Sequence, residues 1–157
     1  AASNRSGRPI TGQPSRGEIM SYFSDSETYY RQMRALFAAI SEQYPLTLEA
    51  IGRANLNIRL TTTDPAASII VHGRKRPVLT TFGDDDVMAD LEIQMTGDTF
   101  HRILLDELSL RQALGSGEVT VRGPIWKALS LGDLFTVGQR CYPAIVEQDP
   151  SRDKTAQ

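Results

Sequence analysis

The sequence predicts an α+β fold, a single domain in which helices cover a mostly antiparallel sheet of five strands. Three observations predict it. Apolar residues recur at helical spacing in the first third of the chain, they alternate with polar residues in later segments, and the connections between those segments are short. The length of 157 residues is typical of one domain, and an apolar content of 40%, glycine not counted, is ordinary for a folded protein.

Two helices are predicted near the N-terminus. Five large side chains recur there with the period of a helix and share one of its faces: Met33, Leu36, Phe37, Ile40 and Tyr44. This spacing predicts an amphipathic helix over 27–43. It ends before Pro45 because proline disfavours the helical conformation in the residue that precedes it. A second, shorter helix is expected over 46–53.

A period of two residues replaces the helical period after residue 55. Leu56, Ile58 and Leu60 alternate with polar neighbours, as in a half-buried strand. Similar segments, separated by turns rich in Gly, Asp and Pro, predict four strands in all: 56–61, 68–71, 78–82 and 87–95. Because parallel neighbours need connections of about a dozen residues or more, we interpret these four strands as an antiparallel meander.

Helical signals return after this meander. The polar segment 96–98 can cap a short helix that carries Phe100, Ile103 and Leu104. Ser109 and Gln112 have the spacing of a capping box, in which each residue satisfies the backbone N–H of the other. A pair of short helices is therefore expected.

The C-terminal part of the domain predicts a fifth strand and a last helix. Val119 and Val121 alternate with polar residues. Pro124 then opens a helix, at a position where its missing N–H costs little. Residues 125–135 are apolar nearly all round that helix, so we expect it to be covered on two sides, by the sheet and by a helix, a partner chain or an apolar molecule.

The two ends of the chain differ from this domain in composition. Residues 1–17 hold three arginines, no acid and one large apolar side chain, and they predict a disordered arm, solvated or in contact with an anionic surface. Residues 147–157 form a polar tail. The folded domain is therefore predicted to span 18–146.

Charge and composition exclude several classes of protein. The chain has 17 basic and 19 acidic residues, and this balance argues against a nucleic-acid-binding protein. The single cysteine, Cys141, cannot form an internal disulfide. No apolar stretch approaches the roughly 18 residues that span a bilayer, and residues 1–17 lack the apolar run of a secretory signal. These observations predict a cytoplasmic location.

The side chains that usually carry chemistry are few and scattered. His72 and His101 have no further histidine or cysteine at metal-ligand spacing. Asp84, Asp85 and Asp86 are typical turn residues and lack the pattern of a calcium loop. No phosphate-binding glycine loop is present. We therefore predict no metal, no cofactor and no catalytic residues.

One segment has a more specific pattern. A strand ends in Thr96-Gly97-Asp98-Thr99-Phe100, two short helices follow, and the run from Ser116 to Gly123 precedes a helix that carries Ala128, Leu131 and Leu134-Phe135. Over residues 86–135 this succession resembles the sterol carrier protein 2 family of sterol- and lipid-binding domains. Glu118 stands where that family commonly has a lysine.

The resemblance implies a twisted sheet covered by helices, with a hydrophobic pocket between the layers. It also implies that the pocket binds a lipid, a sterol, a fatty acyl chain or another hydrophobic small molecule without covalent chemistry, with transfer of that molecule as one use. The residues expected to line the pocket are Phe100, Ile103, Leu104, Leu114, Trp126, Leu129 and Phe135.

Two other functions remain open from the sequence. An enzyme of the isomerase or cyclase type could use the same pocket, with Asp90, Glu92 or His101 as its polar groups. An accessory subunit could instead dock the apolar face of its last helix on a protein partner or on a second copy as a homodimer. Transient contact with a membrane through the basic tip at 74–76 is also left open.

Overall fold

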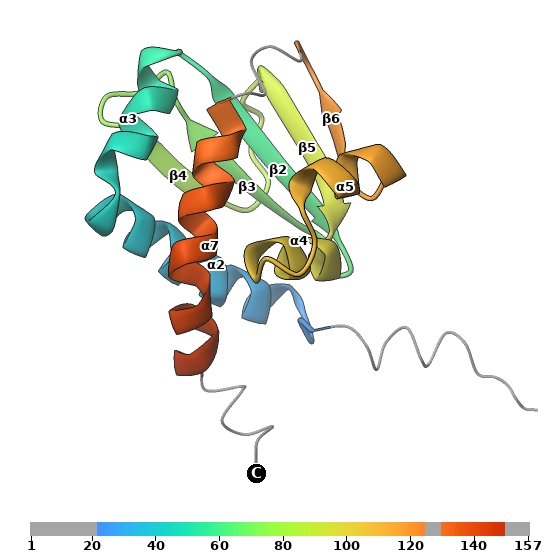
Figure 1. Cartoon of the computed structure of the whole chain (residues 1–157). Coiled ribbons are helices and arrows are strands. Elements are labelled where there is room, and N and C mark those ends of the chain that lie inside the picture. Colours follow the sequence, from blue (N-terminus) through green and yellow to red (C-terminus); the bar gives the residue numbers. More distant parts are fainter. Residues whose placement is uncertain (1–21, 125–129, 150–157) are drawn as a thin grey trace, which may run out of the picture.

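The computed structural model describes residues 22–124 and 130–149 (Figure 1). Within them, five strands form one sheet in the order β4-β3-β2-β5-β6. Helices α2, α4 and α7 lie over one face of this sheet (Figure 1). The α+β class and the mostly antiparallel, five-stranded sheet predicted from the sequence are confirmed.

The two N-terminal helices begin and end where local sequence signals place them. Helix α2 spans Ser26–Gln43, and the carboxylate of Asp25 accepts a hydrogen bond from the N–H of Thr28 at 2.8 Å, which caps its first turn. Helix α3 spans Pro45–Arg53 and starts at the proline that ends α2. The apolar face of α2 is buried against the sheet, as its spacing predicts.

The sheet contains the main correction to the sequence analysis, because the fourth predicted strand does not continue the antiparallel meander of the first three. Strands β2 (Asn57–Thr63), β3 (Ala67–His72) and β4 (Leu79–Phe82) pair in antiparallel order. Strand β5 (Leu91–Thr96), however, pairs with β2 and runs parallel to it. The prediction considered only the short turn before β5, whereas the β3–β4 hairpin supplies the long connection that a parallel neighbour needs.

The segment 83–90 returns the chain from β4 to β5 and explains why the strand predicted over 87–95 begins only at residue 91. Gly83 donates a backbone hydrogen bond to Ser68, and Asp90 donates one to Asn57. The carboxylate of Asp90 in turn accepts from the N–H of Asn57 at 2.8 Å and pairs with Arg74 at 2.6 Å. These polar contacts fix the entry to β5 before ladder pairing begins.

The C-terminal elements follow the predicted order. Helix α4 spans Gly97–Leu104, α5 spans Leu110–Ser116 with the predicted capping box, and β6 spans Thr120–Arg122. Helix α7 is described from Ser130 to Gln148, so residues 125–129 of the predicted last helix lie outside the described residues.

The end of α7 extends into the segment expected to be a polar tail. The helix continues through Gln148, and Asp149 is buried and pairs with Arg31 of α2 at 3.2 Å. The ion pair joins Asp149 to the folded domain. Composition alone does not reveal such a tertiary contact, so the polar residues 147–149 read as a tail.

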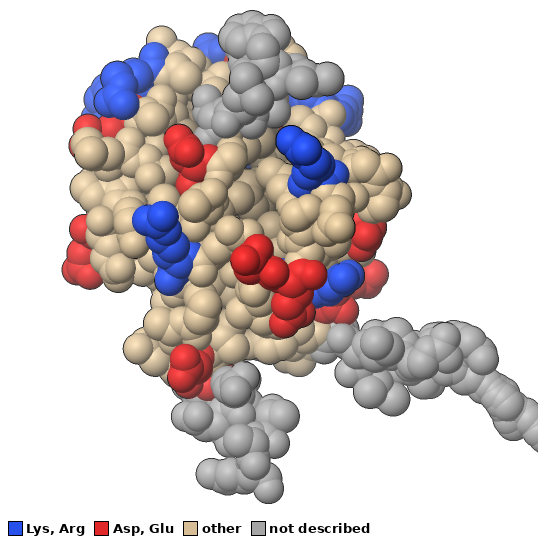
Figure 2. Space-filling view, viewed as in Figure 1, with Lys and Arg blue, Asp and Glu red and all other residues tan. Residues whose placement is uncertain are grey.

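The two faces of the sheet have different surroundings. On the face away from the helices, Glu92 lies between Arg59 and Arg122, at 3.9 and 3.6 Å. On the helical side, the outer surface shows acidic and basic side chains interspersed among uncharged ones (Figure 2). In the described parts of the chain, no helix combines the length and apolar content needed to cross a bilayer.

Gly123 is expected to be required where β6 approaches the start of β5. Its φ of 124° is unfavourable for other residues, and a Cβ there would collide with the carbonyl oxygen of Asp90. Gly123→Ala should therefore lower the free energy of unfolding by about 1–3 kcal/mol, measured by urea denaturation. Gly115→Ala, in helix α5 with open space around it, should raise it by about 0.5–1 kcal/mol. Equal effects of the two substitutions would contradict this account.

Candidate functional site

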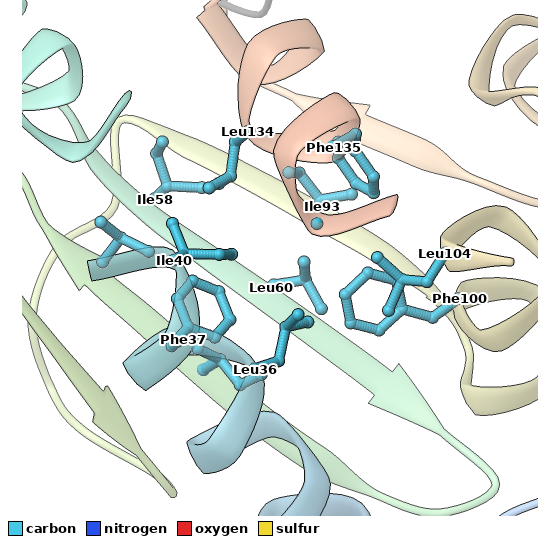
Figure 3. Close-up of a pocket in the computed structure, with 13 residues that line it drawn as sticks. Leu36, Phe37, Ile40, Ile58, Leu60, Ile93, Phe100, Leu104, Leu134 and Phe135 are labelled. Carbon is cyan, nitrogen blue, oxygen red and sulfur yellow. The ribbon is translucent and has the colours of Figure 1, made fainter. Parts of the chain in front are cut away.

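The described residues enclose an apolar cavity between the sheet and the helices that cover it (Figure 3). Its volume is about 20 Å³. Every described residue that lines it is aliphatic, aromatic or glycine: Leu36, Phe37, Ile40, Ile58, Leu60, Ile69, Val71, Ile93, Phe100, Leu104, Leu134, Phe135 and Gly138.

The floor of the cavity comes from three neighbouring strands. Ile58 and Leu60 of β2 lie side by side with alternate residues of β3 and with Ile93 of β5. Successive side chains of a strand point to opposite faces of a sheet, so the alternation that predicts these strands also places one row of branched side chains under the helices. Arg59 and Glu92, one position away, point to the other face.

The roof comes from three helices. Leu36, Phe37 and Ile40 of α2 follow helical spacing and point towards the sheet (Figure 3). Phe100 of α4 and Phe135 of α7 pack edge to face, with ring centroids 6.0 Å apart. An edge-to-face pair is favourable by about 0.5–1.5 kcal/mol beyond the area it buries, so this pair helps to fix the relative position of α4 and α7.

The size and the wall of the cavity limit what it can do. A space of this volume is large enough for about one water molecule, but no polar side chain of the described residues lines it to bind one. Among residues 22–124 and 130–149, the wall contains no acid, base, nucleophile or metal ligand. The arrangement can bury hydrocarbon, and a larger guest requires the roof and the floor to separate.

The residues predicted from the sequence to line a pocket occupy different places. Phe100, Leu104 and Phe135 line this cavity. Ile103 is fully buried but is not part of the cavity wall. Leu114 is 43% exposed on α5 and does not reach it. Trp126 and Leu129 lie outside the described residues.

Sequence reasoning missed the contributions of α2 and of the sheet. The family resemblance covers residues 86–135, whereas most of the wall precedes residue 86. The signal was present, since Leu36, Phe37 and Ile40 stand on the apolar face of α2 and Ile58 and Leu60 on the apolar face of β2. The sequence does not reveal that β2 pairs with β5, and this pairing brings the two halves of the wall together.

A closed polar network holds the helices together away from the cavity. Tyr142 of α7 donates to Gln32 of α2 at 3.2 Å, and its hydroxyl lies 2.7 Å from Nδ1 of His101 on α4. Gln32 donates to the hydroxyl of Tyr22 at 3.1 Å, and the ring of Tyr22 stacks on His101 at 3.7 Å. Since the proton of Tyr142 goes to Gln32, Nδ1 of His101 is the donor in their hydrogen bond.

The polar residues considered for an enzyme are not brought to the cavity. His101 belongs to the network just described, and burial lowers its pKa to about 4. Asp90 caps the start of β5, and Glu92 pairs with arginines on the opposite face of the sheet. No residue of the described cavity wall is titratable.

Comparisons with solved structures identify the fold. The sterol carrier protein domain 2 of Helicoverpa armigera matches 71% of this chain and 88% of its own, with a TM-score of 0.56 and 12% identity. Sterol carrier protein 2 from Yarrowia lipolytica matches 62% of this chain and 80% of its own, with a TM-score of 0.46 and 18% identity. The inverting sec-alkylsulfatase Pisa1 from Pseudomonas sp. matches 58% of this chain, with a TM-score of 0.44 and 18% identity, and this chain covers 13% of that enzyme. No family model and no curated protein matches the sequence.

Titration of His101 is expected to make stability depend on pH. Its folded pKa of about 4 lies below its usual 6.5, so between these values the unfolded chain binds more protons and stability rises with pH. Urea midpoints should increase from pH 4 to about 6.5 and then level off. His101→Gln should reduce that slope. It should not abolish it, because the pKa of His72 is also lowered by burial and His72 contributes to the same pH dependence. An unchanged slope in the variant would refute the assignment.

Proposed function

We propose that this chain, which has a sterol carrier protein 2-like fold, binds an apolar small molecule between its sheet and helices α2, α4 and α7. The ligand is a lipid, a sterol or an acyl chain, held without covalent chemistry for transfer or storage. The observation that carries the proposal is the apolar wall that the described residues form around the cavity, at the point where three helices meet three strands.

The hydrophobic effect can supply the affinity of such a site. A ligand that buries about 400 Å² of hydrocarbon gains about 10 kcal/mol, and association costs about 4 kcal/mol or more. The difference corresponds to a dissociation constant of tens of micromolar. A wall without polar groups adds no desolvation cost of its own when hydrocarbon covers it.

The ligand needs more room than about 20 Å³, and the contacts of α7 indicate where it opens. The part from Gln139 onward is held by polar contacts: Gln139 donates to the carbonyl of Ile103 at 2.9 Å, Tyr142 belongs to the His101 network, and Asp149 pairs with Arg31. The part before Gln139 covers the cavity with Leu134 and Phe135. Apolar contacts have no fixed direction, so this part can move away from the sheet at lower cost.

The residues proposed to touch the ligand therefore extend the set predicted from the sequence. Phe100, Leu104 and Phe135 remain in it, and Leu60 and Leu134 join them from β2 and α7. No contact of the described residues favours the enzyme or the accessory subunit over a binding protein.

A pair of glycine variants in α7 should test the location of the site. Gly138 faces the cavity, where a Cβ would lie 3.0 Å from Leu104, whereas Gly132 of the same helix has nothing within 4 Å. Gly138→Met should place a flexible apolar side chain in the ligand's space and weaken binding of the hydrocarbon probe diphenylhexatriene about tenfold or more. Gly132→Met should leave binding unchanged, as measured by fluorescence titration. Equal effects of the two variants would exclude this cavity.

The function itself is tested with the unmodified chain. Organic extracts of the purified protein, analysed by mass spectrometry, should contain an apolar molecule in near-stoichiometric amount, and a fluorescent apolar probe should bind and be displaced by lipids. If no molecule is extracted and no probe binds, the proposed function is wrong.

A further inference from the structure

One buried polar group near the cavity, the hydroxyl of Tyr29, makes no hydrogen bond to the described residues. Tyr29 of α2 is fully buried and lies on the same face as Leu36, two helical turns further along. Its ring packs between Phe23 and Phe100, with centroids at 5.0 and 6.4 Å. Phe100 also lines the cavity, so the tyrosine stands directly behind part of the cavity wall.

The hydroxyl of Tyr29 has no hydrogen-bond partner among the described residues. The hydroxyl of Thr62 is close enough to act on the pKa of Tyr29 as a hydrogen-bonding side chain does, but the pair falls short of hydrogen-bond geometry, and Thr62 donates its own proton to the carbonyl of Pro65 at 2.9 Å. An unpaired buried hydroxyl costs about 1–3 kcal/mol. Most buried polar groups in folded proteins avoid this cost, so an exception calls for an explanation.

The position of Thr62 relates this hydroxyl to the cavity. Thr62 is the next residue after Leu60 on the inner face of β2, about 6.7 Å further along the strand. Its neighbours across the sheet are Ala67 of β3 and Met95 of β5. Ala67 is small and Met95 is flexible, so the side chains that flank Thr62 yield to a guest more easily than branched or aromatic side chains.

The other polar groups of the interior do not share this property. Gln32, Tyr142 and His101 use one another as partners, and Tyr30 accepts from the N–H of Ser68 at 2.9 Å. In the described interior, the proton of Tyr29 is the one left available beside the apolar layer.

We propose that the hydroxyl of Tyr29 donates a hydrogen bond to a neutral oxygen of the bound molecule. The ligand is then a hydrocarbon body with a single uncharged acceptor, a ketone or an alcohol, at the end that lies deepest in the protein. This inference rests on the proposed function of the cavity and adds the chemical class of the ligand and the residue that recognises it.

The surroundings select against a charged group at that end. No cation lines the cavity or contacts the ring of Tyr29 in the described structure. Burial raises the pKa of Tyr29 far above its usual value, so the same environment disfavours any anion and keeps the tyrosine protonated as a donor. A carboxylate buried there would lack a counter-ion.

A double comparison of two proteins and two ligands tests the proposal. Tridecane and 2-tridecanone share a carbon skeleton and differ in one oxygen, and each is assayed as a competitor of diphenylhexatriene. Tyr29→Phe should weaken binding of the ketone about tenfold, which corresponds to the loss of one hydrogen bond. The affinities for tridecane and for the probe should not change. Tyr44→Phe, at the far end of α2 and outside the cavity wall, is the control and should change neither competitor.

Each result decides between the two proposals. Binding of the probe and of tridecane with no effect of Tyr29→Phe on the ketone overturns the role of Tyr29 and leaves the proposed function intact. Failure of the unmodified chain to bind any of the three compounds overturns the proposed function, and this inference with it. Urea denaturation supplies a readout without ligand: the empty Tyr29→Phe protein should be at least as stable as the unmodified one, and a clear loss of stability would show that the hydroxyl serves the fold.

Discussion

The rest of the structure depends on one constraint, the burial of an apolar layer between the inner face of the sheet and three helices. Strand alternation turns one row of branched side chains towards that layer, and helical spacing turns a second row to meet it. Neither row can be covered by its own element, so the helices and the sheet are stable only together. The cavity is the part of this layer that rings and branched side chains fail to fill.

Polar contacts are distributed unevenly around this layer. The network of His101, Tyr142, Gln32 and Tyr22 joins α4, α7, α2 and the segment before α2 at one place. Directional bonds of this kind hold one geometry, whereas the packing over the cavity depends on area alone. The domain therefore combines a part in which directional bonds keep the helices in register with a part held by apolar packing alone, and the proposed binding of a large guest relies on the second part.

Much of this architecture could be predicted from the sequence, because the signals that set it are local. Pro45 separates two helices, the Ser109 capping box starts a third, and alternation marks the strands. The pairing of β2 with β5 could not be predicted, since it depends on where segment 83–90 returns, and alternation is identical in parallel and antiparallel strands. The cavity wall could be predicted only in part for the same reason. Phe100 and Phe135 lie within the family motif, whereas Leu60 has the pattern of any core residue. Tyr29 gave no signal, because a missing partner is visible only in three dimensions.

The parallel pairing of β2 with β5 also orders events during folding. Hairpins β2–β3 and β3–β4 join residues close in sequence and can form early, whereas β2 must wait for a partner that begins at Leu91. Until then β2, the central strand of the final sheet, has an unpaired edge, and its row of branched side chains is exposed. Between the two steps a newly made chain thus exposes an apolar face beside an unpaired strand edge, the two features that favour aggregation of incompletely folded chains.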